Sequence, residues 1–161
     1  MYTPKTTASL SLTISAFAFL VASSLPLSTP AHAAEPTPKM TMGNGDKNWI
    51  LTEGVKRDAS TLTFEKVHIN SDGWLVMHPF ENGAPNGDKY IAASFLKEGD
   101  NEQVDIKVHK GIETGEMFIV MLHQDSNQNE IFDFVFVDDV NVMDKAVFEG
   151  HKMIGHIFRA P

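Results

Sequence analysis

The stretch from Met117 to Val137, MFIVMLHQDSNQNEIFDFVFV, constrains the fold of this chain more than any other segment. It consists of two apolar runs, residues 117–123 and 131–137, separated by a short segment of amide and acidic side chains. Apolar runs of this length are typical of buried strands, and a polar connector between two of them predicts a hairpin. We therefore expect the two runs to pair antiparallel at the centre of a sheet.

The rest of the chain repeats this alternation of short apolar runs and turn signals. Asn70 to Gly73 has turn chemistry, the loop 81–88 contains two Asn-Gly pairs, and Pro79 is expected to end a strand. No segment shows the periodicity of an amphipathic helix. The sequence therefore predicts an all-β fold, an antiparallel, immunoglobulin-like β-sandwich of about seven or eight strands. Outside the hairpin, the expected strands are residues 49–51, 61–69, 74–78, 90–96, 104–108 and 151–158.

Residues 1–33 have the pattern of a secretory signal peptide. Lys5 supplies a positive charge, residues 10–22 an apolar segment, and Ala31-His-Ala33 a small-x-small cleavage site. The apolar part is too short for a membrane helix, so we expect no membrane span after cleavage and a periplasmic or secreted protein. Residues 34–48, rich in Pro, Gly and Thr, are expected to be a flexible arm that leads into a single β-sandwich domain, residues 49–161.

Charge and cysteine content exclude several classes of function. The chain carries a formal net charge of −8, which argues against nucleic acid or anionic lipid as a partner. It contains no cysteine, which excludes disulfides, thiol catalysis, thiolate zinc sites and the usual blue-copper site. Any metal ligand must then be His, Met, Asp, Glu, Asn or a backbone carbonyl.

His78 and His123 are the first candidate metal ligands, because each follows an apolar strand segment. If the two strands are neighbours, both imidazoles lie at one rim of the sandwich, within roughly 10 Å of each other and near Asp125. Two histidines and a carboxylate suit zinc or copper(II), and a methionine in place of the carboxylate suits copper(I). The alternative is that each histidine caps a strand end and bonds to loop backbone.

The polar connector after His123 offers a second candidate site. Its oxygen-bearing side chains occupy positions 1, 3, 5 and 9 of a calcium-binding loop. Glu130 stands where such a loop needs glycine, and Phe136 stands where it needs a bidentate glutamate. The alternative is a polar loop whose side chains satisfy local backbone groups. The candidate calcium ligands are Asp125, Asn127, Asn129 and Asp133.

His151 and His156 form a third and weaker candidate, which with Met153 suggests copper. They are five residues apart, so on a regular strand they point to opposite faces and do not chelate one ion together. The alternative is that the two histidines are simply exposed and the methionine is part of the core, with no shared function. No nucleophile in an activating setting, paired catalytic carboxylates, phosphate-binding glycine loop or dinucleotide motif is present, so we expect no enzyme.

Several short motifs in order resemble a known family. They are the run GWLVMH at residues 73–78, Gly83-Ala-Pro85, Glu98-Gly-Asp-Asn101, and MLH-x-D at residues 121–125. Together they resemble DUF7282, a domain of unknown function in exported bacterial and archaeal proteins, over roughly residues 60–158. The resemblance implies an exported β-sandwich, with the family's two histidines at His78 and His123 and its aspartate at Asp125. The segment from Glu149 to His156 departs from the family pattern by its richness in His and Met.

The leading hypothesis is an exported, non-catalytic binding or accessory module whose partner is an unidentified protein or small ligand. The alternative is a periplasmic metal-handling protein that uses the rim histidines for copper or zinc. No cofactor is assigned from the sequence; copper, zinc and calcium are the candidates.

Overall fold

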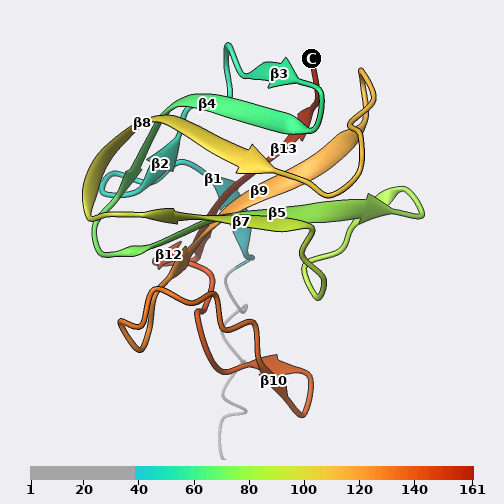
Figure 1. The fold of residues 1–161 in the computed structure, drawn as a ribbon. Helices are drawn as coiled ribbons and strands as arrows, with labels where there is room; N and C mark the ends of the chain where they lie inside the picture. Colours follow the sequence, from blue (N-terminus) through green and yellow to red (C-terminus); the bar gives the residue numbers. More distant parts are fainter. Residues whose placement is uncertain (1–38) are drawn as a thin grey trace, which may run out of the picture. The chain divides into compact units, whose positions relative to one another are not determined.

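The computed structural model describes residues 39–161, so the expected signal peptide and the first five residues of the expected arm lie outside the described residues. Within this range the chain is all-β, with thirteen short strands in three sheets, one of them curled into a half-barrel (Figure 1). None of the described residues belongs to a helix long and apolar enough to cross a membrane. The predicted all-β class is confirmed, with more and shorter strands than expected.

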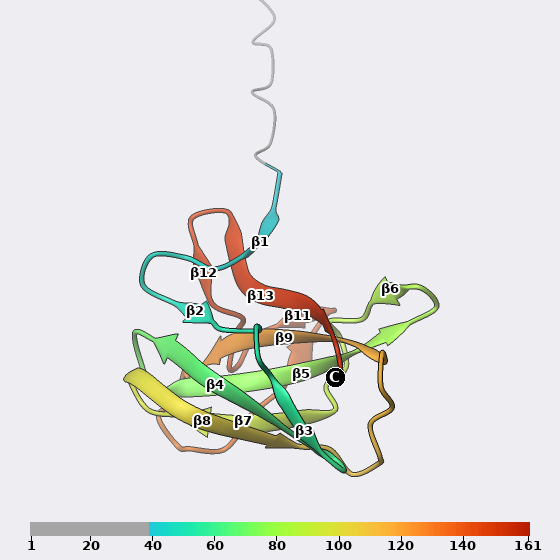
Figure 2. The same cartoon turned by 90° about the horizontal axis from the view of Figure 1, so that it is seen from above.

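The largest sheet has seven strands built around two long antiparallel neighbours, β5 (Gly73–Glu81) and β9 (Met117–Gln124). On the far side of β9 lies β13 (Lys152–Arg159), which pairs antiparallel with β9 and parallel with β1 (Thr41–Gly43). Figure 2 shows β1 and β12 beside β13. The remaining strands of this sheet are β6 (Ala84–Pro85), β7 (Ala92–Leu96) and β12 (Phe148–Glu149).

The second sheet has four strands and faces the first. Its main pair is β4 (Thr61–Ile69) with β8 (Gly99–Lys107), and Figure 1 shows this pair on one side of β5 and β9. The short strands β2 (Trp49–Ile50) and β3 (Lys56–Asp58) also pair with β4. On the other side of β5 and β9 lies a separate two-stranded ribbon, β10 (Phe136–Val137) with β11 (Val140–Asn141).

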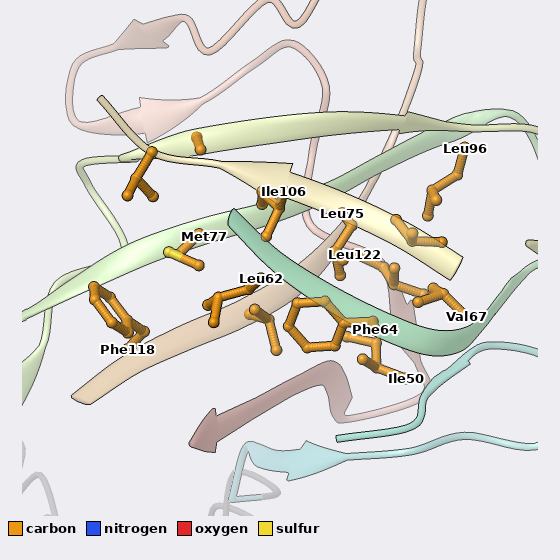
Figure 3. Packing of buried hydrophobic residues seen from close by; sticks show 14 of the residues in the cluster. Ile50, Leu62, Phe64, Val67, Leu75, Met77, Leu96, Ile106, Phe118 and Leu122 are labelled. Atoms are coloured by element: carbon orange, nitrogen blue, oxygen red, sulfur yellow. The ribbon is translucent and has the colours of Figure 1, made fainter. Parts of the chain in front are cut away.

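The hydrophobic core fills the space between the two larger sheets (Figure 3). Alternate residues of a strand point to opposite faces, and this period decides which side chains enter the core. Leu75 and Met77 of β5 and Val120 and Leu122 of β9 face the second sheet and are fully buried. The residues between them therefore point to the back of the seven-stranded sheet. These are Trp74, Val76, His78, Ile119, Met121 and His123.

The predicted hairpin between residues 117–123 and 131–137 is wrong. β9 pairs with β5 and β13 instead, and only the last two residues of the second run form a strand, which pairs with β11. The reason is the alternation of Phe132, Phe134 and Phe136 with polar or smaller residues. Successive rings of this set contact each other, with centroids 5.5 and 4.8 Å apart, and cross the back of the sheet without joining its ladder.

Several strand boundaries also differ from expectation, and two of these differences have a clear physical cause. Pro79 does not end its strand: β5 continues to Glu81, with Pro79 opposite Phe118 of β9. Pairing with β7 stops at Met77, so Pro79 lies at an edge of β5 where proline is tolerated. Within the expected arm, residues 41–43 form β1, because the open edge of β13 offers them backbone partners.

Candidate functional site

The back of the seven-stranded sheet carries a second layer of aromatic side chains. Phe132 lies over Trp74 and His123, with ring centroids 5.6 and 5.4 Å apart. Phe134 lies over both histidines of the sheet, at 5.8 Å from His78 and 5.9 Å from His123. The segment after β9 thus folds back over β5 and β9 and excludes water from the side chains beneath it.

His78 and His123 meet under this cover. In the ladder, His123 is paired with Trp74, and the next cross-strand pair on the same face is Val76 with Met121. His78 belongs to the pair after that. The two histidines therefore lie on either side of the row formed by Val76 and Met121. Their imidazoles lean toward each other across that row, with the two Nε2 atoms 3.3 Å apart. The predicted proximity is confirmed. The predicted rim position is wrong: both side chains are buried, at 0% and 1% exposure, and Phe134 lies over both rings.

The outer nitrogen of each ring is held by a backbone carbonyl. His78 Nδ1 lies 2.6 Å from the carbonyl oxygen of Lys89, and His123 Nδ1 lies 2.6 Å from that of Asp144. A carbonyl oxygen only accepts, so each Nδ1 must carry the hydrogen and donate it. In a neutral imidazole the other nitrogen then has no hydrogen. The two Nε2 atoms therefore face each other with bare lone pairs.

Protonation does not relieve this contact at neutral pH. Burial lowers the pKa of His123 to about 4; the Asp144 carbonyl opposes this shift, and the nearby His78 adds to it. Burial also lowers the pKa of His78. Two buried acceptors at hydrogen-bond distance with no hydrogen between them are unfavourable unless a cation bridges them.

The geometry of the pair matches that of two ligands on one metal ion. Nitrogens about 2.0–2.1 Å from a tetrahedral ion are about 3.3–3.4 Å apart, which is the separation of the two Nε2 atoms here. Metal-binding histidines also commonly donate their second ring N–H to a carbonyl, as both do here. The arrangement has the donor atoms and the orientation that a metal site needs.

Asp144 is a residue of this region that the sequence did not single out. It is fully buried, and its carboxylate accepts the backbone N–H groups of Ser126 at 2.9 Å and Asp133 at 2.7 Å. Its own carbonyl orients His123, so one residue fixes both the covering segment and the imidazole. A single aspartate between Met143 and Lys145 belongs to no sequence pattern that predicts this role.

The four candidate calcium ligands make the contacts of a self-contained polar loop. The Asp125 carboxylate accepts the backbone N–H groups of Asn129 at 3.3 Å and Glu130 at 3.0 Å. The Asp133 carboxylate accepts the side-chain amides of Asn127 and Asn129 at 2.8 and 2.9 Å. These bonds are the ones expected of the alternative to a calcium site, a polar loop whose side chains satisfy local hydrogen-bond donors. Because the Asp125 carboxylate is engaged by its own loop, it does not serve as the third ligand of the histidine pair.

The two C-terminal histidines are not part of the buried pair. His151 is exposed in the turn before β13, and His156 Nε2 contacts Asn44 Oδ1 at 2.7 Å. Among residues 39–161, no group of three or more His, Cys, Asp or Glu side chains is placed to hold one metal ion. A third protein ligand for the pair must therefore be of another kind.

A groove of about 390 Å³ opens beside His123. Its walls are mostly apolar, and two methionines line it together with the histidine, Met121 from β9 and Met153 from β13. Gly155 lies opposite Met121 in the ladder, and a Cβ at that position would come within 2.8 Å of Met121 Cγ. Because Gly155 has no side chain, the Met121 side chain can occupy the space above it. The lining residues include Phe134, Phe136, Ala146 and Phe148.

Another polar atom on this face lacks a partner. Apart from the two histidine Nε2 atoms, the buried Trp74 Nε1 is the one buried side-chain nitrogen or oxygen without a hydrogen bond in the described part of the chain. It belongs to the same aromatic layer as the histidine pair, since Trp74 contacts Phe132. Unsatisfied buried polar atoms are rare in folded proteins, and a functional role is one of the few physical reasons for keeping them.

The fold and the site define an all-β protein with a covered histidine pair on the back of its largest sheet. The family model described as "Domain of unknown function (DUF7282)" matches residues 50–153, and the chain belongs to this family. The matched span contains β5, β9, both histidines and the aromatic cover. No curated protein matches the chain, and no solved structure matches it.

Proposed function

We propose that this protein is an exported, non-catalytic binding protein whose ligand is a transition-metal ion held by His78 and His123. The observation that carries the proposal is the convergence of two hydrogen-free Nε2 atoms at 3.3 Å, with each Nδ1 bonded to a carbonyl. Imidazole is the common protein ligand for zinc, copper, nickel and iron. The absence of catalytic motifs in the sequence supports binding rather than catalysis.

Burial supports a pre-formed site. Both imidazoles are oriented before any ion arrives, so binding costs little side-chain entropy. The aromatic cover from Phe132 and Phe134 limits the water that competes for the ion. The site is also protected from exchange with solvent, which suits a protein that retains or carries a metal rather than one that exposes it.

Export and the finer architecture belong to the same proposal. The signal-peptide pattern of residues 1–33 supports a periplasmic or secreted location. The strand connectivity supports an immunoglobulin-like sandwich, because β1 runs parallel to β13 at the edge of one sheet and β2, β3, β4 and β8 form the other.

The test is a metal titration of the purified mature protein by calorimetry, with Zn²⁺, Co²⁺ and copper as probes. His78→Asn is the informative variant, because its side-chain amide can still donate to the Lys89 carbonyl while the metal-facing nitrogen is gone. His109→Asn, at an exposed histidine, is the matched control. We expect one ion per chain for the wild type and the control and none for His78→Asn. Equal binding by a folded His78→Asn protein would refute the proposal.

A second candidate function is supported by the groove beside His123. Its volume of about 390 Å³ and its apolar walls fit a small apolar molecule. Such a ligand would remain bound during gentle purification and appear by native mass spectrometry. Ala146→Phe, which fills the groove, would remove the bound molecule; if no adduct is found in the wild type, this candidate fails.

A further inference from the structure

We infer that the ion held by the histidine pair is copper(I), and that the Met121 thioether is its third protein ligand. This inference rests on the proposed metal-binding function and extends it to the identity of the ion and of the ligand. It depends on where Met121 lies, on which other donors are already engaged, and on the charge that this part of the protein can accommodate.

Met121 occupies the row of the sheet over which the two imidazoles meet. β9 directs Met121 and His123 to the same face, and Val76, opposite Met121, has no donor atom. Met121 is only 5% exposed and lines the same groove as His123. Its unbranched side chain has three rotatable bonds, so a change of rotamer can bring its sulfur to an ion above its own row.

The two buried carboxylates of this region are engaged in other contacts. Asp125 accepts two backbone N–H groups of its own loop, and Asp144 accepts two from the covering segment. The charged side chains that line the groove, Asp88 and Lys145, are both exposed. Among the described residues, no group of three or more His, Cys, Asp or Glu side chains, the ligands that zinc prefers, is placed to hold one ion. Met121 is the one buried residue besides His123 that lines the groove, and its thioether is the donor there.

The charge of the ion follows from this ligand set. Two neutral imidazoles and a thioether leave the full ionic charge uncompensated under an aromatic cover. The cost of burying an ion rises with the square of its charge, so a divalent ion costs about four times as much as a monovalent one. Copper(I) is monovalent and prefers soft thioether and imidazole donors at low coordination number.

Further methionines lead from the surface toward the site. Met153 of β13 lines the groove with Met121, and Met42 of β1 is the neighbour of Met153 in the parallel ladder. The three residues point to the same face of the sheet and are progressively more buried, from 36% exposure at Met42 to 5% at Met121. This order offers a soft ion successive thioether contacts on its way to the histidines.

The experiment measures copper(I) affinity anaerobically by competition with bicinchoninate, and Zn²⁺ affinity separately, on the mature protein. Met121→Leu conserves the volume of the side chain and removes its sulfur. We expect this variant to bind copper(I) about tenfold more weakly or worse, because it loses one of three ligands, and to bind Zn²⁺ as the wild type does.

Met77→Leu is the matched control. Met77 lies on β5 in the same sheet, opposite Val120 of β9, but its side chain faces the core and is fully buried there. Met121 faces the back of that sheet. Met77→Leu therefore makes the same chemical change on the opposite face, and we expect it to leave both affinities unchanged.

Each outcome separates this inference from the proposed function. If Met121→Leu binds copper(I) as tightly as Met77→Leu does, the thioether is not a ligand and the inference is overturned, while metal binding by the histidines stands. A wild-type protein that binds Zn²⁺ more tightly than copper(I) also overturns it. If His78→Asn binds either ion like the wild type, the proposed function itself fails. A sulfur shell in the copper X-ray absorption spectrum, lost in Met121→Leu and kept in Met77→Leu, is the expected direct signature.

Discussion

The two faces of the β5–β9 pair carry different chemistry on the same two strands. The front face contributes Leu75, Met77 and Leu122 to a core of purely apolar side chains. The back face, built from the alternate residues of the same strands, carries His78 and His123 under a layer of phenylalanines. The front stabilises the fold through burial alone, whereas the back keeps polar atoms without ordinary partners.

This difference shows how one pair of strands serves two purposes. The front face supplies the free energy of burial that holds the sheets together. That stability allows the back face to hold two hydrogen-free nitrogens at 3.3 Å, an arrangement that costs free energy in the absence of a bridging cation. The comparison predicts that mutations on the front face change the stability of the fold. Mutations on the back face are expected to change metal binding and the pH dependence of stability.

The largest effect is expected on the front face. Leu122→Ala removes a fully buried side chain, and we expect the free energy of unfolding to fall by about 4 kcal/mol. Urea denaturation followed by circular dichroism measures the change. Ile131→Ala, at a residue 60% exposed, is the control and should change stability by less than about 0.5 kcal/mol. A small loss for Leu122→Ala would mean that the front face is not the stabilising core.

The back face should make the metal-free protein sensitive to acid. The folded-state pKa of His123 is lowered to about 4, so the unfolded chain takes up its proton first as the pH falls below about 6.5. The contribution of this residue to stability is then complete above about pH 6.5 and declines toward pH 4, by up to about 3 kcal/mol. Denaturation curves across this range measure the slope. His123→Asn, which cannot titrate, should flatten the curve; an unchanged slope would contradict the assignment.

Metal binding should stabilise the protein through the same pair. An ion at a hundredfold excess over its Kd raises the free energy of unfolding by about 2.7 kcal/mol. We expect the melting temperature to rise with copper(I) in the wild type and not in His78→Asn. An equal rise in both proteins would show that the ion binds elsewhere.

The smallest effect is expected at the polar loop after β9. Because the Asp125 carboxylate is engaged by the N–H groups of Asn129 and Glu130, we expect no specific calcium site there. Melting curves with calcium at fixed ionic strength should shift equally for the wild type and Asp125→Ala. A rise of several degrees in the wild type that Asp125→Ala abolishes would show that the loop binds calcium.

Local pattern was a good guide to the strands and a poor guide to their partners. The period-two alternation of β8 and the apolar run of β9 identify them as strands wherever they pair. The run 131–137 has the same local pattern but packs as a layer of rings on the back of the sheet. The conformation of this run depends on contacts with Trp74 and His78, which are distant in sequence, so no local pattern predicts it.

The sequence by itself determined the all-β class, the absence of thiol chemistry and the identity of the two histidines as candidate ligands. Only the tertiary structure decided that His78 and His123, 45 residues apart, bring their Nε2 atoms together beneath an aromatic cover. The physical reason is that alternation along a strand is a local property. The pairing of β5 with β9, and the carbonyls of Lys89 and Asp144 that orient the rings, come from segments that meet only when the chain is folded.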